Sequence, residues 1–146
     1  MDLLNLEENQ QITIEKEKYK ILNRIEYTEK SSYWVEYKLQ NIQTSKYYYL
    51  NVELSSEAIL YETINQTKID LKMNIKFQNE EFELFEKGTG KVKTYYGMTD
   101  VCLNDEVNYY EYKSKENLQK VLSIEKWKDK TQISIGKIIS FSKIKL

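Results

Sequence analysis

Residues 68–77 read KIDLKMNIKF, with a hydrophobic side chain at every second position. A period of two is typical of a β-strand that has one face buried and the other in water. The same alternation occurs in residues 33–39, YWVEYKL, and in residues 48–54, YYLNVEL. The hydrophobic face of the last segment consists of Tyr48, Leu50, Val52 and Leu54. The pattern predicts a sheet in which these segments pair.

Further segments are predicted as strands because they are rich in β-branched and aromatic residues. They are residues 12–15, 19–27, 57–64, 82–85, 91–96, 109–113, 121–127, 133–135 and 138–144. Turn-forming residues separate many of them, and Gly88-Thr89-Gly90-Lys91 is interpreted as a hairpin turn because it lacks the spacing of a phosphate-binding loop. Residues 3–10 and 114–121 have a second interpretation as short helices, the latter capped by Ser114. Many short strands with close turns predict an all-β fold, either an antiparallel sandwich or a partly open barrel.

Two short motifs recur along the chain at similar offsets. Glu36-Tyr37-Lys38 returns as Glu111-Tyr112-Lys113, and residues 50–53, LNVE, are echoed by residues 122–125, LSIE. One interpretation is a fold of two pseudo-symmetric halves. The other is that strands rich in tyrosine and lysine resemble one another by composition alone.

The composition excludes much familiar enzymology. The 146 residues contain no histidine and one cysteine, Cys102, so the usual general base and commonest metal ligand are missing, and no intrachain disulfide can form. We therefore expect neither a catalytic residue nor a metal or other cofactor, and favour a binding protein over an enzyme. Because Val101 and Leu103 flank Cys102, we expect an inert thiol in a strand.

Length and charge bound the organisation of the chain. We expect residues 1–146 to form a single domain, since nothing resembling a linker interrupts them. The 22 basic residues nearly balance the 23 acidic ones, which argues against nucleic acid as the main partner. The acidic amino terminus lacks the features of a signal peptide, and no apolar run approaches a membrane span. We expect a cytoplasmic protein without a membrane span.

Four glutamates occupy corresponding places in the two proposed halves: Glu36, Glu53, Glu111 and Glu125. Carboxylates brought together could bind a cationic ligand, or act as acid and base on a sugar. In the alternation of residues 33–39, however, Glu36 falls between apolar residues and is expected to point outward into water. The structural interpretation, a solvated outer face, is therefore preferred to the functional one.

Aromatic residues supply the other candidate contacts. Trp34 and Trp127, if exposed, would suit the centre of a protein interface. Tyrosine runs at residues 47–49, 95–96 and 109–112 suggest a surface on which single-stranded nucleic acid could stack. Because neighbouring residues of a strand point to opposite faces, no run can place all its rings on one platform.

Several segments together resemble a bacterial family known as domain of unknown function 4178. They are residues 19–22 (YKIL), 34–39 (WVEYKL), 49–53 (YLNVE), 95–97 (YYG), 109–112 (YYEY), 122–127 (LSIEKW) and 133–139 (ISIGKII). The resemblance implies a compact bacterial domain and assigns no activity to any residue.

Three functional hypotheses follow. The first is a small binding or interaction module with a protein partner, contacted through Trp34 and Trp127. The second is a receptor or enzyme for a small cationic or sugar ligand that uses Glu36, Glu53, Glu111 and Glu125; it requires a pocket in which at least two of them converge. The third is a single-stranded nucleic-acid binder.

Overall fold

The computed structural model describes residues 2–53 and 55–146. Within them the chain forms eleven β-strands and one short 3₁₀ helix, which confirms the all-β prediction. The strands are β1 (Gln11–Ile14), β2 (Glu17–Glu29), β3 (Ser32–Asn41), β4 (Tyr47–Val52), β5 (Glu57–Ile64), β6 (Asn74–Phe77), β7 (Glu80–Gly97), β8 (Glu106–Ser114), β9 (Lys120–Lys126), β10 (Thr131–Ser140) and β11 (Ile144–Lys145), and the helix is η1 (Phe141–Lys143). Leu54, expected on the apolar face of residues 48–54, lies outside the described residues.

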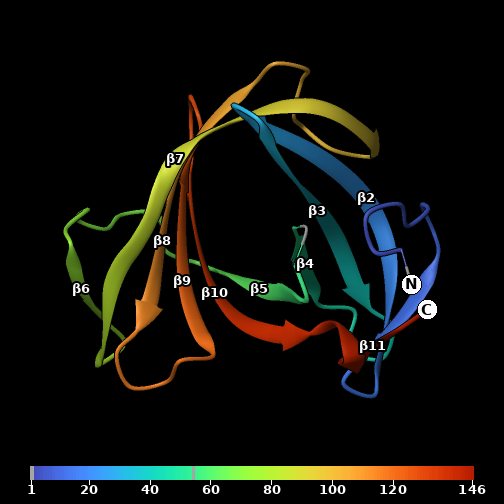
Figure 1. The fold of residues 1–146 in the computed structure, drawn as a ribbon, viewed down its shortest axis with the longest axis horizontal. Helices are drawn as coiled ribbons and strands as arrows, with labels where there is room; N and C mark the ends of the chain where they lie inside the picture. The colour runs from blue at the N-terminus through green and yellow to red at the C-terminus, as the bar shows by residue number, and fades with distance from the viewer. Residues whose placement is uncertain (1, 54) are drawn as a thin grey trace.

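Eight of the strands form an antiparallel barrel (Figure 1). Their order around it is β2-β3-β4-β5-β10-β9-β8-β7, and pairing of the second half of β7 with β2 closes the ring. The predicted barrel is thus closed rather than partly open. At the seam, β1 and β11 continue the sheet beyond β2, and β6 continues it beyond β7.

The two sequence motifs fall on equivalent strands of two similar halves, β1–β5 and β6–β10. Glu36 of β3 is paired with Asn51 of β4, and Glu111 of β8 is paired with Ser123 of β9, so the repeated motifs share one register. Two-residue turns with positive φ at both positions join β1 to β2 and β6 to β7. Such turns favour tight antiparallel hairpins. The topology therefore supports the interpretation as two pseudo-symmetric halves.

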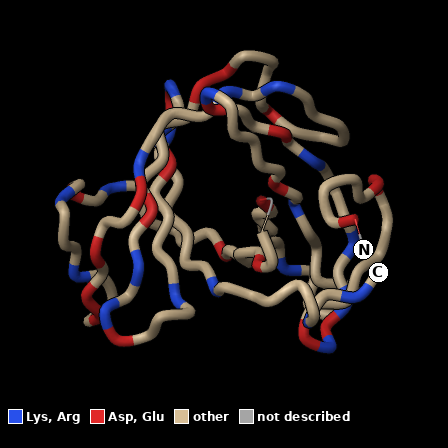
Figure 2. Tube along the Cα trace, in the orientation of Figure 1, with Lys and Arg blue, Asp and Glu red and all other residues tan. Residues whose placement is uncertain are grey.

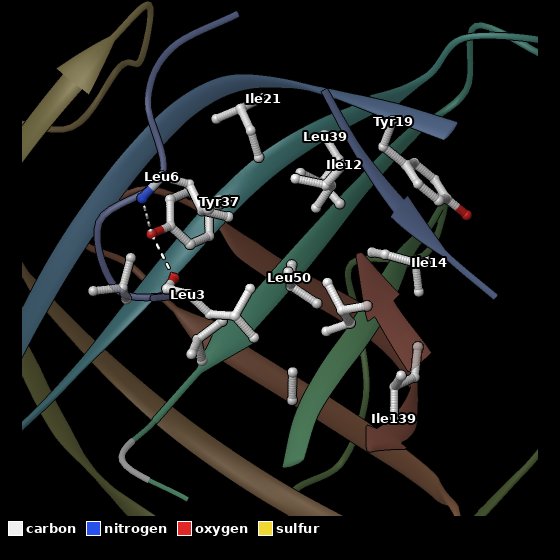
Figure 3. Packing of buried hydrophobic residues seen from close by; sticks show 14 residues of the cluster. Leu3, Leu6, Ile12, Ile14, Tyr19, Ile21, Tyr37, Leu39, Leu50 and Ile139 are labelled. Carbon is white, nitrogen blue, oxygen red and sulfur yellow. Dashed lines mark hydrogen bonds between the residues drawn. The ribbon is translucent and has the colours of Figure 1, made fainter. Parts of the chain in front are cut away.

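A large apolar cluster covers the outer face of β3 and β4 (Figure 3). Val35, Tyr37 and Leu39 of β3 are fully buried there, under β1, β11 and the amino-terminal segment. The hydroxyl of Tyr37 donates to the Leu3 carbonyl at 2.7 Å and accepts from the Leu6 amide at 3.1 Å. These bonds hold the amino-terminal segment against the barrel in an irregular form, so the helical interpretation of residues 3–10 is wrong.

A second outer cluster covers β8 and β9 on the other half of the barrel. Its buried members are Ile75, Phe77, Phe82, Tyr112, Leu122, Ile124 and Ile133. A third cluster lies inside the barrel, near the connection between β7 and β8, and contains Ile25, Tyr27, Val92, Val101 and Val107. The buried apolar side chains are therefore divided between two clusters outside the barrel and one cluster at an end of the lumen.

The segment with the most regular alternation is only partly a strand. In residues 68–77 the strand begins at Asn74, while Ile69 and Leu71 pack on the second outer cluster in extended chain that is not paired. A period of two in the sequence indicates only that one side of the extended chain is buried. A strand also needs a neighbour for its backbone hydrogen bonds. The pattern predicted the buried side correctly for Ile75 and Phe77 and in part for Ile69 and Leu71, but Met73 on the same face is 64% exposed.

Three other local predictions are corrected. Residues 88–90 form no turn, since β7 runs without interruption from Glu80 to Gly97. Residues 114–121 are not helical, although the Ser114 hydroxyl accepts from the amides of Glu116 and Asn117 as a cap would. Cys102 is exposed in the loop between β7 and β8, not in a strand.

Candidate functional site

The lumen of the barrel contains a cavity of about 240 Å³. Because side chains alternate along a strand, the residues that point into it are the ones that do not contribute to the outer clusters. Its walls are both polar and apolar, with Trp34, Ile59, Tyr61, Val107, Tyr109, Val121 and Ile138 among them. A smaller cavity of about 10 Å³ shares Asn51, Tyr61, Glu111 and Glu125 with it and so lies directly beside it.

Three glutamates meet in this interior, and we call them the deep carboxylates: Glu36, Glu111 and Glu125. Glu111 and Glu125 line both cavities, and Glu36 lines the smaller one. In the ring of eight strands β3 lies opposite β9, so Glu36 faces Glu125 across the lumen. Only 9% of the Glu36 surface is exposed. The prediction that Glu36 points outward is therefore wrong.

The reason for that error is that both faces of β3 are covered. Val35, Tyr37 and Leu39 point away from the lumen, where the outer cluster buries them. In an isolated sheet, the face opposite such residues would be in water, and a glutamate there would be solvated. Closure of the barrel turns that second face inward and encloses Glu36.

The deep carboxylates differ in their partners. Glu111 accepts hydrogen bonds from the Tyr61 hydroxyl at 2.9 Å and from the Ser123 hydroxyl at 3.0 Å. The Glu36 carboxyl accepts none from residues 2–53 and 55–146. The ion pairs that lysine and arginine form within the described residues involve other acids: Glu15, Glu26, Glu80, Glu81 and Asp100.

Burial without a cationic partner favours the protonated form of a carboxyl. It raises the pKa of Glu111 to about 8, although the hydrogen bonds from Tyr61 and Ser123 act in the opposite direction. It raises the pKa of Glu125 to about 7, against the effects of Trp127 and Lys130. For Glu36, burial and then the charges of Glu125 and Glu111 raise the pKa well above its ordinary value. In all three deep carboxylates, burial therefore favours the neutral form over the charged one.

Further acids lie toward the open end of the large cavity, and we call them the mouth carboxylates: Glu29, Glu53, Glu57 and Glu86. The hydroxyl of Tyr109 donates to Glu29 Oε1 at 2.5 Å and lies 3.4 Å from Glu86 Oε1. Partial burial and the charge of Glu86 raise the pKa of Glu53. The basic residue in this wall is Lys113, whose Nζ lies 4.7 Å from the centre of the Phe85 ring.

Strand glycines make room for side chains of the site. A Cβ atom at Gly88 would lie 2.3 Å from Glu29 Oε2, and one at Gly90 would lie 2.8 Å from the Trp34 ring. A Cβ atom at Gly136 would lie 2.6 Å from the Tyr61 ring. Glycine inside a strand often marks such a close approach. This explains why Gly88 and Gly90 lie within β7 rather than in the predicted turn.

The structure distributes the six predicted site residues unevenly. Glu36, Glu111 and Glu125 come together, Glu53 lies at the mouth, and Trp34 lines the cavity. Trp127 packs instead on the apolar cluster at the end of the lumen. Both tryptophans are half-buried against Tyr27, with ring centres 5.4 Å and 6.2 Å from it. They do not form the exposed pair that the interface hypothesis required.

Sequence analysis missed Glu29, Tyr61 and Glu86 as site residues, and it considered Tyr109 only as part of a stacking surface for nucleic acid. Gly88, Gly90 and Gly136 were the available signal, because each of these three glycines lies beside a side chain of the lumen. The tyrosine runs divide as expected: Tyr109 points into the lumen and Tyr112 into the second outer cluster. Tyr47 and Tyr95 are exposed on separate strands, β4 and β7.

The fold and the cavity define a closed antiparallel β-barrel with an acidic lumen. The chain belongs to the family described as domain of unknown function (DUF4178), whose model matches residues 8–141. No curated protein and no solved structure matches the chain. In the described part of the chain, no helix is both long and apolar enough to cross a membrane.

Proposed function

We propose that this barrel is a receptor for a small organic cation, which binds in the lumen between the deep carboxylates. The observation that carries the proposal is Glu36, a carboxyl nine-tenths buried and without a hydrogen-bond or ionic partner among the described residues, beside Glu111 and Glu125. Burying acids without cations destabilises a fold. A ligand that supplies the missing positive charge would recover that free energy.

The walls suit an ammonium group attached to an apolar body. Glu36 and Glu125 would accept hydrogen bonds from the ammonium, while Tyr61 and Ser123 hold the carboxyl of Glu111 in place. Trp34 and Tyr109, which pack edge-to-face with ring centres 5.6 Å apart, add aromatic surface to the wall of the cavity. A volume of about 240 Å³ is slightly below the range of drug-sized sites, so the ligand is small.

The other two hypotheses receive less support. A protein interface centred on Trp34 and Trp127 would need both rings exposed, and both are half-buried. A nucleic-acid surface would need aromatic rings gathered on a basic face. Basic and acidic residues are instead intermixed around the barrel (Figure 2). The proposal therefore keeps a binding role, expected in the bacterial cytoplasm, and replaces the protein partner by a small cation.

Titration calorimetry with hexylamine and with 1-hexanol, its neutral counterpart, tests the proposal. We expect saturable binding of the amine and none of the alcohol, with affinity reduced at least ten-fold in the double variant Glu111→Gln/Glu125→Gln. Glu62→Gln, which removes an exposed acid from the outer side of β5, should bind like the native protein. Equal affinity for the amine in the double variant would refute a site at the deep carboxylates.

A further inference from the structure

The acids of the lumen form a continuous track from the mouth to its deepest part. Glu86 of β7 is paired with Glu111 of β8, and Glu125 of β9 is paired with Tyr109, the residue two positions before Glu111. Glu53 follows β4 at the mouth, and its pKa responds to the charge of Glu86. Glu36 lies at the inner end of the track, where the charges of Glu125 and Glu111 act on it.

The strand register gives the spacing of these acids. Side chains paired directly across two antiparallel strands have Cβ atoms about 5 Å apart, which applies to Glu86 and Glu111. Diagonal neighbours, such as Glu111 and Glu125, are separated by about 7–8 Å. Glu36 stands across the lumen on β3. The series of acids thus runs over three neighbouring strands, β7, β8 and β9, and continues on β3 across the ring, so it extends across the lumen.

The number of acids in the track also favours a ligand with more than one positive charge. One ammonium group would displace the proton of one carboxyl and leave the neighbouring carboxyls protonated, whereas a ligand with two ammonium groups can form an ion pair with two of them. The apolar residues Ile59, Val121 and Ile138 line the same cavity as the track. Methylene groups bind well against such side chains. The complementary molecule therefore alternates positive groups with short hydrocarbon segments.

We propose that the ligand is a linear aliphatic cation with two or more ammonium groups, bound lengthwise along Glu86, Glu111, Glu125 and Glu36. This inference rests on the proposed function, because it requires that the lumen admit an organic cation. Lys113 marks the outer end of the track, where its charge opposes a further ammonium group. The inner ammonium would lie between Glu36 and Glu125, and the outer one between Glu111 and Glu86.

Calorimetric titration of the full chain with α,ω-diaminoalkanes of three to eight carbons, each compared with the monoamine of equal length, tests the inference. We expect at least ten-fold tighter binding of the diamine at one optimal length. The variant Glu86→Gln, at an exposed position and therefore safe for folding, should abolish this preference while the monoamine still binds. Glu62→Gln serves as the matched control.

The outcomes separate the two proposals. Equal affinity for diamine and monoamine would overturn the linear polycation and leave the cation receptor standing. Absence of binding by every amine would overturn both. Saturable binding of Mg²⁺ that displaces the diamine from the same carboxylates would show a site for a compact point charge, and would also overturn the inference.

Discussion

Replacing the Glu111 carboxyl by an amide should make the stability of the barrel much less dependent on pH. The pKa of Glu111 is raised from 4.5 to about 8 in the folded protein. A carboxyl with a raised pKa binds more protons in the folded state than in the unfolded state, so its stabilising effect is complete below pH 4.5 and is lost as pH rises toward 8. Glu36 and Glu125 act in the same direction.

The magnitude follows from the two pKa values. Between pH 5.5 and pH 7.5 the Glu111 carboxyl alone should lower the free energy of unfolding by about 2 kcal/mol, after a discount for water that enters the cavity. Glu111→Gln removes this loss while keeping a side chain of the same shape beside Tyr61 and Ser123. The acids with lowered pKa, such as Glu15 and Glu80, change stability only below about pH 4.5, outside this window.

Urea unfolding at pH 5.5 and pH 7.5 measures the effect in the native chain, in Glu111→Gln and in the control Glu62→Gln. We expect the native protein and the control to lose about 2 kcal/mol more than Glu111→Gln as pH rises. If the three proteins show parallel pH profiles, the Glu111 carboxyl titrates normally, and the reasoning about a buried acid without a counter-ion is refuted.

Three further predictions concern the packing and the chemistry of the lumen. Gly136→Val places a side chain against the Tyr61 ring, so we expect the free energy of unfolding to fall by about 1–3 kcal/mol and amine binding to weaken. Thermal unfolding measures the change in stability. Tyr37→Phe leaves the Leu3 carbonyl and the Leu6 amide without their partner and should cost about 1–3 kcal/mol, whereas Tyr47→Phe, at an exposed ring, should be neutral. Amine affinity should increase from pH 6 to pH 8, by up to about ten-fold per pH unit for each proton displaced, because the raised pKa values let protons compete with the ligand. A pH-independent affinity in calorimetry would show that the carboxyls at the site are already ionised.

The sequence predicted the strands well because a period of two depends only on which side of a chain is buried. The repeat was one of two interpretations of the sequence, and the structure favours it because Glu36-Tyr37-Lys38 and Glu111-Tyr112-Lys113 occupy matching strands. Continuous β7 was missed because Gly88 and Gly90 have the composition of a turn, and only the side chains opposite them explain glycine at those places.

The acidic interior was not predictable from one strand at a time. Glu36 was identified as a candidate, yet its direction depends on closure of the ring between β2 and β7, a contact between segments far apart in the chain. The same closure places Glu29 of β2 on the Tyr109 hydroxyl, whereas Glu86 lies beside Glu111 through the pairing of β7 with β8. Local alternation states which residues share a face, but not whether that face encloses water or protein.

The most direct test of an acidic lumen that exchanges protons for an organic cation is the proton balance on binding. Titration with 1,6-diaminohexane at pH 7.0 in phosphate and in MOPS, buffers with different enthalpies of ionisation and without a primary ammonium group, gives the number of protons released per ligand. The account predicts saturable binding with net proton release, lost in Glu111→Gln/Glu125→Gln. Absence of binding, or binding with no proton release that persists in the double variant, would contradict it.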